Sequence, residues 1–295
     1  MQALPAPAAI AYPQIDPVIV RIGPVGVHWY GLAYVAGFLV AGLVFRALNR
    51  RWKVGLTDDD VLTAVLYAIV GVLVGGRLGY VLFYGGTTYV EDPSRILLVW
   101  QGGMSWHGSF VGILLAGVLL KRRFKIPFLR LADMAAVGAP AGFFFGRLAN
   151  FVNAELWGRA TDLPWGMVFP GTDGLPRHPS QLYEATLEGF VMFVVLMLLA
   201  LRKRADGFFF GMFALMYGAF RFGIEFVREP DAQLGFILGP FTMGQALSAP
   251  LVLVGAYFVF RAVKQDREQK AAERRINEAA RKAKGASAVE PGSEE

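Results

Sequence analysis

The fold is decided by apolar stretches such as Val61–Tyr84, which reads VLTAVLYAIVGVLVGGRLGYVLFY and carries a single charged residue, Arg77. As a helix, a stretch of this length can cross the roughly 30 Å of hydrocarbon in a bilayer. Its residues do not alternate between apolar and polar, as those of an outer-membrane barrel strand would. Within a bilayer, a helix satisfies the backbone hydrogen bonds of a single segment, so we predict a transmembrane helix here.

Similar stretches occur along most of the chain. Of its 295 residues, 55% are hydrophobic and 18% are charged, whereas soluble proteins average about 45–50% and about 25%. This composition excludes an ordinary soluble domain, a disordered chain and a collagen-like chain. We predict an all-α polytopic membrane protein with seven transmembrane helices, at Trp29–Leu48, Val61–Tyr84, Trp106–Leu120, Phe128–Phe151, Leu182–Leu201, Phe208–Val227 and Thr242–Val263.

The basic residues predict the direction of the chain through the membrane. Clusters of Lys and Arg follow the first, third, fifth and seventh segments, and include Arg46–Lys53, Lys121–Lys125 and Arg202–Arg204. Cytoplasmic loops are enriched in Lys and Arg, so the N-terminus is predicted outside and the C-terminus in the cytoplasm. We assign the net charge of +6 to these loops and predict no nucleic-acid partner.

The chain divides into a membrane domain and peripheral parts. Residues 1–28 form an extracytoplasmic or interfacial segment. Its part Met1–Pro24 contains five prolines, which predict irregular structure, and lacks the basic start of a signal peptide. Residues 29–263 form the transmembrane domain, including a Pro- and Gly-rich extracytoplasmic cap at about 153–181. Residues 264–295 form a charged cytoplasmic tail, with a solvated or frayed helix over Lys264–Lys284 and disorder over Ala286–Glu295.

Two segments carry glycines at four-residue spacing, a pattern that lets helix backbones approach closely. These glycines are Gly71, Gly75 and Gly79 in the second segment and Gly138, Gly142 and Gly146 in the fourth. We assign them to packing and not to function.

The absence of cysteine excludes disulfides, Cys-ligated metals and a Cys nucleophile. The three histidines, His28, His107 and His178, are too scattered for a zinc site. We therefore predict no metal and no other cofactor. His28 and His178 are interpreted as interfacial or structural residues.

Polar residues inside the apolar segments indicate a site, because charges in a bilayer are costly and usually face a cavity or a partner. Arg147 and Asn150 share one face of the fourth segment. Tyr217, Arg221 and Glu225 share one face of the sixth. With the predicted orientation, these residues lie in the outer half of the membrane, as do Tyr30, Arg77 and His107. We predict a functional cavity at that depth.

The residue types suit an anionic phosphate held by arginines, with a lone histidine as general base. No internal nucleophile is apparent, so such a catalyst must activate a nucleophile that its substrate supplies. A simpler interpretation stays open, in which Arg221 and Glu225 form an internal ion pair and Arg147 extends to the membrane interface.

The segment Gly146–Thr161 reads GRLANFVNAELWGRAT, and shorter motifs are WYG at 29–31, GGRLGY at 75–80, GMSWHG at 103–108, HPSQLYE at 178–184, and an Arg221-Phe222, Glu225 and Arg228–Asp231 pattern. Together they resemble the bacterial phosphatidylglycerol–prolipoprotein diacylglyceryl transferase family. The resemblance covers about residues 15–262. Ser109 and Ala149 depart from it, because the family often has glycine at these two positions.

The resemblance implies transfer of the diacylglyceryl group of phosphatidylglycerol to the lipobox cysteine of a prolipoprotein, with release of glycerol 1-phosphate. It implies a site at the outer leaflet of the bacterial cytoplasmic (inner) membrane. The implied partners are phosphatidylglycerol, prolipoprotein signal peptides and membrane lipids. Because the substrate supplies the thiol, the enzyme itself needs no cysteine.

The resemblance also implies residue roles. His107, Arg147 and Arg221 are the predicted catalytic residues: the histidine takes the thiol proton, and the arginines hold the phosphate and stabilise the leaving group. Whether the histidine or an arginine-assisted thiolate starts the reaction stays open. The predicted substrate-binding residues are Tyr30, Arg77, Gly108, Asn150, Glu155, Gly158, Tyr217 and Glu225.

Two other functional classes compete with this prediction. A lipid flippase or small-anion transporter would also place arginines in a membrane cavity, but the polar residues cluster in the outer half and no internal repeat is visible. A rhomboid-like protease needs an intramembrane serine paired with a histidine, and no such pairing is evident in the sequence.

Overall fold

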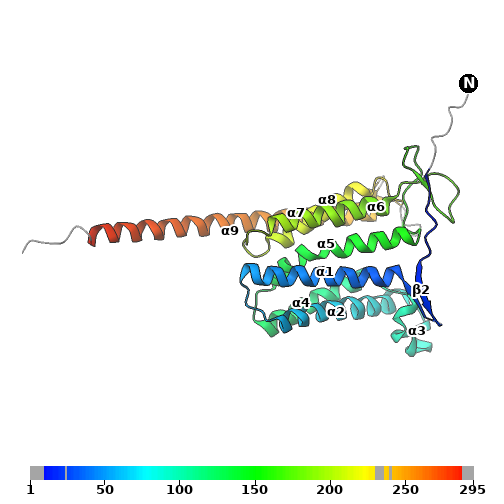
Figure 1. The fold of residues 1–295 in the computed structure, drawn as a ribbon, viewed down its shortest axis with the longest axis horizontal. Helices are drawn as coiled ribbons and strands as arrows, with labels where there is room; N and C mark the ends of the chain where they lie inside the picture. The colour runs from blue at the N-terminus through cyan, green and yellow to red at the C-terminus, as the bar shows by residue number, and fades with distance from the viewer. Residues whose placement is uncertain (1–9, 24, 230–235, 239–240, 288–295) are drawn as a thin grey trace, which may run out of the picture.

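Long helices lie side by side in the computed structural model, which describes residues 10–23, 25–229, 236–238 and 241–287 (Figure 1). The helices of the bundle are α1 (Trp29–Trp52), α2 (Asp58–Tyr84), α4 (Trp106–Phe124), α5 (Phe128–Val152), α6 (Ser180–Glu184), α7 (Met192–Leu199), α8 (Phe208–Ile224) and α9 (Met243–Ser287). A π-helical segment, η3 (Ala185–Val191), joins α6 to α7. Between α2 and α4 the chain forms the short helices α3 (Thr88–Glu91), η1 (Pro93–Leu97) and η2 (Val99–Gln101).

Within the described residues, five helices are long and apolar enough to cross a membrane: α1, α2, α5, the α6–η3–α7 helix and the first part of α9. Helix α8 is apolar but has 17 residues. Helix α4 has 19 residues and ends in the basic run Lys121, Arg122 and Arg123. Each of the predicted apolar segments lies on one of these helices, and the chain is a multi-pass membrane protein.

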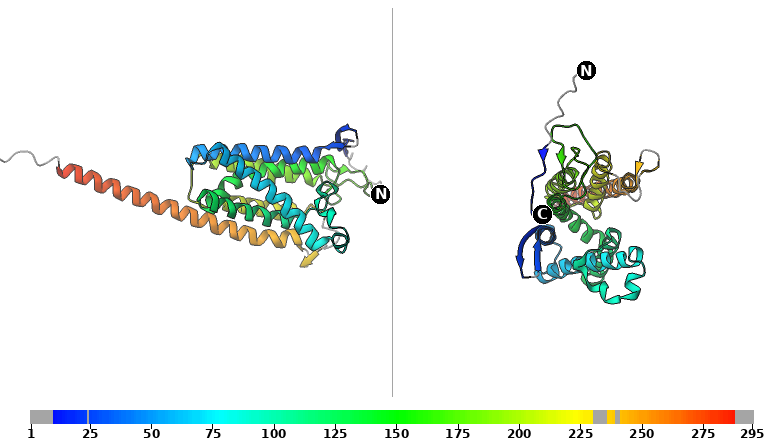
Figure 2. Two further views of the ribbon diagram at one scale, coloured as in Figure 1. Left: turned by 90° about the horizontal axis from the view of Figure 1, so that it is seen from below. Right: turned by 90° about the vertical axis from the view of Figure 1, so that its right-hand side faces the viewer.

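The helices pack in pairs around α5. Helix α2 packs along α4, α1 along α5, and α8 along α9, while α5 also contacts α4, α6, η3, α7 and α8. The end-on view in Figure 2 shows the α2–α4 pair and the α8–α9 pair on different sides of the bundle. Helix α5 is therefore in a position to carry residues into the centre of the molecule.

The predicted packing role of the glycines is confirmed at the α2–α4 contact. A Cβ atom added to Gly75 would lie 2.4 Å from the carbonyl oxygen of Gly108, and one added to Gly112 would lie 1.9 Å from that of Gly71. Glycine thus lets two helix backbones touch. On α5, a Cβ atom at Gly138 would meet Ala41 of α1 at 2.9 Å, whereas Gly146 faces open space.

The core of the bundle is apolar and so is much of its outer surface. Met134, Met192 and Leu196 are fully buried between α5 and α7. On the outside, large apolar side chains are widely exposed, among them Leu82, Leu253 and Phe260. An exterior of this kind suits hydrocarbon and not water.

The prediction that Met1–Pro24 is irregular is wrong for Val18–Ile22, which form a strand. Strand β2 (Val18–Ile22) pairs antiparallel with β3 (Val25–His28), and β1 (Ile10–Ala11) pairs parallel with β4 (Met167–Val168) of the cap. Pro17 precedes β2, and Val and Ile are common within the strands, where β-branched residues are favoured. Residues 1–9 and Pro24 lie outside the described residues.

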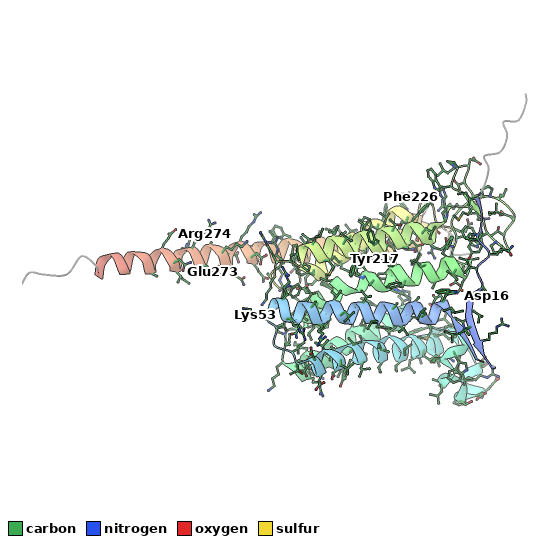
Figure 3. The ribbon with its side chains drawn as sticks, viewed as in Figure 1. Asp16, Lys53, Tyr217, Phe226, Glu273 and Arg274 are labelled. Atoms are coloured by element: carbon green, nitrogen blue, oxygen red, sulfur yellow. The ribbon has the colours of Figure 1, made fainter. Side chains whose placement is uncertain are left out.

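The charged tail continues the last helix. Helix α9 extends without a break past Val263 to Ser287 and projects beyond the bundle, where Glu273 and Arg274 lie on its free part (Figure 3). Asp16 and Lys53 mark the two opposite ends of the bundle in the same view. The predicted tail helix is confirmed. The helix also includes Ala286 and Ser287, so the prediction of disorder is wrong for these two residues; residues 288–295 lie outside the described residues.

A carboxylate of α5 caps the N-terminus of α8. Asp133, which is 1% exposed, accepts hydrogen bonds of 2.8 Å from the backbone N–H groups of Gly207 and Phe210. The first N–H groups of a helix have no partner within the helix, so a side chain must satisfy them where water is excluded. Asp133 therefore fixes where α8 starts relative to α5.

We expect Asp133→Asn to lower the free energy of unfolding by about 1–3 kcal/mol, because an amide turns a donor toward one of the two N–H groups and leaves it unpaired. Thermal unfolding in detergent, followed by circular dichroism, measures this loss. Asp206→Asn is the control, since Asp206 pairs with Arg130 at a part-exposed position and should matter less. Equal unfolding temperatures for Asp133→Asn and the wild type would contradict this role.

Candidate functional site

Three arginines converge on one buried carboxylate. Glu184 is fully buried, and its Oε2 lies 2.7 Å from Nη2 of Arg147 and 3.2 Å from Nη1 of Arg221. Its Oε1 lies 3.2 Å from Nη1 of Arg228. Arg147 comes from α5, Glu184 from α6 and Arg221 from α8, so this single carboxylate joins three helices.

A second carboxylate supports the same arginines. Glu225, directly after α8, forms an ion pair with Arg221 and lies 3.9 Å from Nε of Arg228. Its Oε2 accepts a 2.6 Å hydrogen bond from the hydroxyl of Thr242. Gly244 of α9 packs against the Glu225 carboxylate so closely that a Cβ atom there would lie 2.4 Å from it. The predicted Arg221–Glu225 ion pair is therefore present, as one part of a larger network.

The arginines of the network are partly exposed, whereas its acids are buried. The side chains of Arg147, Arg221 and Arg228 are 18%, 16% and 11% exposed, whereas Glu184 and Glu225 are 0% and 4% exposed. The arginine side chains are thus less deeply buried than the two acids that they pair with. Guanidinium groups held in fixed orientations can bind phosphate or carboxylate oxygens through paired N–H donors.

A chain of hydrogen bonds extends from Arg147 toward α1. Arg147 Nη1 donates to Oδ1 of Asn150 at 3.3 Å. The Asn150 amide donates to Oε1 of Glu155 at 2.6 Å and to the hydroxyl of Tyr30 at 3.3 Å. Four of the predicted site residues therefore lie in direct contact, and they come from α1, α5 and the loop after α5.

The backbone is strained on both sides of Glu155. Its neighbours Ala154 and Leu156 have φ angles of 53° and 57°, in the left-handed region that non-glycine residues rarely adopt. Each such residue costs about 1–2 kcal/mol. The side-chain amide of Gln181 donates to the Glu155 carbonyl at 2.6 Å and helps to fix this conformation. Strain of this kind is concentrated at functional sites.

Tyr217 lies within the bundle (Figure 3), where its ring stacks on Phe143 with centroids 5.2 Å apart. The charged groups nearest to its hydroxyl include Glu188, Arg221 and Arg147. The structure thus places Tyr217 beside the arginine network, as predicted from its shared helix face with Arg221.

His107 is separate from this network. It lies exposed on the first turn of α4, and its ring contacts that of Trp106 edge-on at a centroid distance of 5.2 Å. Among the described residues, no hydrogen bond or ion pair joins His107 to the arginines. Its neighbour Gly108 packs against α2, where a Cβ atom would lie 2.2 Å from the Gly75 carbonyl oxygen.

The guanidinium group of Arg77 is used in hydrogen bonds within the protein. It is 4% exposed and donates to the backbone carbonyls of the loop before α4, namely Arg95, Ile96, Leu98, Gly102 and Gly103. These bonds occupy all three nitrogens of its side chain. This geometry gives no support to the predicted contact with substrate, and it assigns Arg77 to holding the α2–α4 loop.

Gly158 anchors the cap to the network. Its N–H donates to the His178 carbonyl at 2.8 Å, and it forms a β-bridge with Arg228. A Cβ atom at Gly158 would lie 2.5 Å from the carbonyl oxygen of Val227, which explains the need for glycine. Nδ1 of His178 forms a hydrogen bond of 3.2 Å with the Tyr183 hydroxyl. Partial burial lowers the pKa of His178.

Three charged members of the site, Glu184, Glu188 and Arg228, are not among the predicted site residues, although Glu184 and Arg228 lie in the motifs quoted above. Glu184 and Glu188 are the two acids of an otherwise apolar segment, so the rule that charges within a span mark a site applied to them as well. Arg228 lies beyond the predicted end of the sixth segment, and its contacts with Glu184 and Glu225 place it in the site. Within the described residues, no three His, Cys, Asp or Glu side chains gather in a way that could hold a metal ion.

Comparison with known proteins gives a consistent result. Residues 17–261 match the family model described as prolipoprotein diacylglyceryl transferase. The phosphatidylglycerol–prolipoprotein diacylglyceryl transferase of Geobacter sulfurreducens is 52% identical over 244 residues, which cover 83% of this chain and 94% of that protein. Its counterpart in Bordetella parapertussis is 49% identical over 249 residues, covering 84% and 95% of the two chains.

The counterpart in Nitratidesulfovibrio vulgaris strain DP4 is 47% identical over 255 residues, covering 85% of this chain and 95% of that protein. The matched region contains the whole arginine network, from Tyr30 to Thr242. The chain belongs to the prolipoprotein diacylglyceryl transferase family.

Proposed function

We propose that the protein transfers the diacylglyceryl group of phosphatidylglycerol to the lipobox cysteine of prolipoproteins and releases glycerol 1-phosphate. Membership of the family supports the reaction. The observation that carries the proposal for the site is the network of Arg147, Arg221 and Arg228, part-exposed and paired with buried glutamates. A phosphodiester has a single negative charge and oxygens that match guanidinium donors.

The arginines act on the leaving group. The thiol sulfur attacks the lipid carbon that carries the phosphate, the C–O bond breaks, and its electron pair passes to the phosphate oxygen. The phosphodiester becomes a monoester, so negative charge increases on the phosphate in the transition state. Arg147 and Arg221, pre-oriented by Glu184 and Glu225, stabilise that charge without reorganisation.

The thiol proton leaves before or during the attack. His107 is the proposed base, because it is exposed at the start of α4 and an imidazole can accept a proton near neutral pH. The Tyr30–Asn150–Glu155 chain lines the approach to Arg147 and is proposed to bind the glycerol of the headgroup. The open alternative is a thiolate stabilised by the arginines alone.

Incubation of the purified protein with phosphatidylglycerol and a lipobox peptide tests the reaction. We expect the peptide cysteine to gain the mass of one diacylglyceryl group. A Cys→Ser peptide should gain none, because an alcohol is far less ionised than a thiol at the same pH. A peptide unchanged in the presence of folded protein and lipid would contradict the proposed function.

The site is proposed to face the outer leaflet of the bacterial cytoplasmic membrane, with seven helices crossing it. The basic residues after α1, α4 and α7 favour this orientation. Reporter fusions after Lys125 and Arg204 are expected to be cytoplasmic, and one near Gly171 in the cap is expected to be external. A cytoplasmic Gly171 would place the arginine network at the inner leaflet and contradict the orientation.

We expect Arg147→Lys and Arg221→Lys each to lower the transfer rate by about 10²–10³, since an ammonium cannot replace two parallel N–H donors. Lipid affinity should fall as well, because the ground-state phosphate is also bound. Transfer rate and lipid binding are measured side by side. Arg95→Lys is the matched control: Arg95 lies in an exposed ion pair with Asp92. An Arg221→Lys variant with unchanged rate and affinity would reduce Arg221 to an internal partner of Glu225.

His107→Gln is expected to separate base catalysis from lipid binding. Glutamine stays polar but accepts no proton, so the rate should fall by about 10²–10⁴ while lipid affinity persists. Part of the loss should be recovered at higher pH, where more of the substrate thiol is ionised. The measurement is the transfer rate as a function of pH for variant and wild type. A near-normal rate at neutral pH would remove His107 from the mechanism.

A further inference from the structure

Glu188 is a buried acid that the proposed mechanism does not use. It is 0% exposed, and among the described residues neither of its carboxyl oxygens has a hydrogen-bond partner. It lies in the π-helical segment η3, four residues after Glu184. Single π-turns within helices occur frequently at functional sites.

Close packing holds Glu188 in the centre of the bundle. The next residue, Gly189, contacts α5 so closely that a Cβ atom would lie 2.7 Å from Cα of Phe144. The charged and titratable groups that act on Glu188 are Arg147 of α5, Glu184 of α6, Tyr217 and Arg221 of α8, and Arg228 after α8, whereas the neighbouring helix α7 has none. Glu188 therefore belongs to the same electrostatic unit as the three arginines.

The charge of this unit depends on one proton. Glu184 and Glu225 already form ion pairs with Arg147, Arg221 and Arg228. An ionised Glu188 adds one negative charge beside these pairs, and a protonated Glu188 adds none. A buried carboxylate without any hydrogen-bond donor is costly, and the neutral acid avoids most of that cost.

We infer that Glu188 carries a proton when the site holds its lipid, so that it places no additional negative charge beside the phosphodiester anion. Glu188 is then a positioning residue that sets the charge of the site through the arginines. The inference rests on the proposed function, because it takes phosphatidylglycerol as the ligand. Binding of the anion and protonation of Glu188 favour each other, since each reduces the repulsion that the other meets.

The sign of the pH dependence follows. As pH rises and Glu188 loses its proton, the lipid must bind next to an additional negative charge, so lipid affinity decreases. One unit charge at about 6 Å in an effective dielectric of about 20 weakens binding by about a hundredfold. Glu188→Gln, which has the shape of the neutral acid, cannot ionise and should retain its affinity at high pH.

The test is equilibrium binding of a short-chain phosphatidylglycerol to the full-length protein in zwitterionic detergent, from about pH 6 to about pH 9. We expect the wild-type affinity to fall with pH and the Glu188→Gln affinity to exceed it by up to about a hundredfold at the alkaline end. Phosphatidylcholine of the same chain length is the lipid control, because it lacks net charge. Glu268→Gln is the control variant, since Glu268 is exposed on the tail helix.

Calorimetry on the wild type makes the test independent of how the variant folds. In buffers of different ionisation enthalpy, lipid binding at alkaline pH should take up as much as one proton per lipid. Parallel affinity curves for wild type and Glu188→Gln, or lipid binding without proton uptake, would overturn the inference while leaving the transfer reaction standing. A wild type that neither binds phosphatidylglycerol nor modifies a lipobox peptide would instead refute the proposed function.

Discussion

One buried carboxylate, that of Glu184, sets the constraint on which the site depends. A charge with no access to water must be balanced by opposite charges at hydrogen-bonding distance, and three arginines from separate parts of the chain meet this need. Because the arginines lie on or after α5 and α8, satisfying Glu184 also fixes how α5, α6 and α8 meet. The cap is tied to the same point through Gly158, which bridges to Arg228.

Buried acids contact α8 at both of its ends. Asp133 accepts from the first N–H groups of α8, and Glu184 and Glu225 hold Arg221 near its other end. Dispersion contacts among apolar side chains give little orientation in a membrane, where the lipid is as apolar as the protein. Charged contacts at both ends therefore specify the position of α8. With 17 residues, this helix is only just long enough to cross the hydrocarbon of a bilayer.

The sequence predicted those features that depend on composition and spacing within one segment. Apolar run length located the helices, and helical spacing grouped Arg147 with Asn150 and Arg221 with Glu225. Features that depend on contacts between distant segments could not be predicted from the sequence. The carbonyl cluster around Arg77 involves a loop about twenty residues away, and the strand pairing of residues 10–28 depends partly on the cap. Glu184 was overlooked because its segment was classified by its apolar majority.

The network also argues for function on energetic grounds. Buried ion pairs contribute little to stability, and well-packed apolar residues of similar volume often do better. A membrane protein that held these helices together for stability alone would have no reason to bury three arginines and three glutamates among them. The arrangement is explained if the arginines must be oriented before an anion binds to them. Glu184 and Glu225 then serve as fixed counterions that align the guanidinium groups, so that little reorganisation is needed when phosphate charge develops.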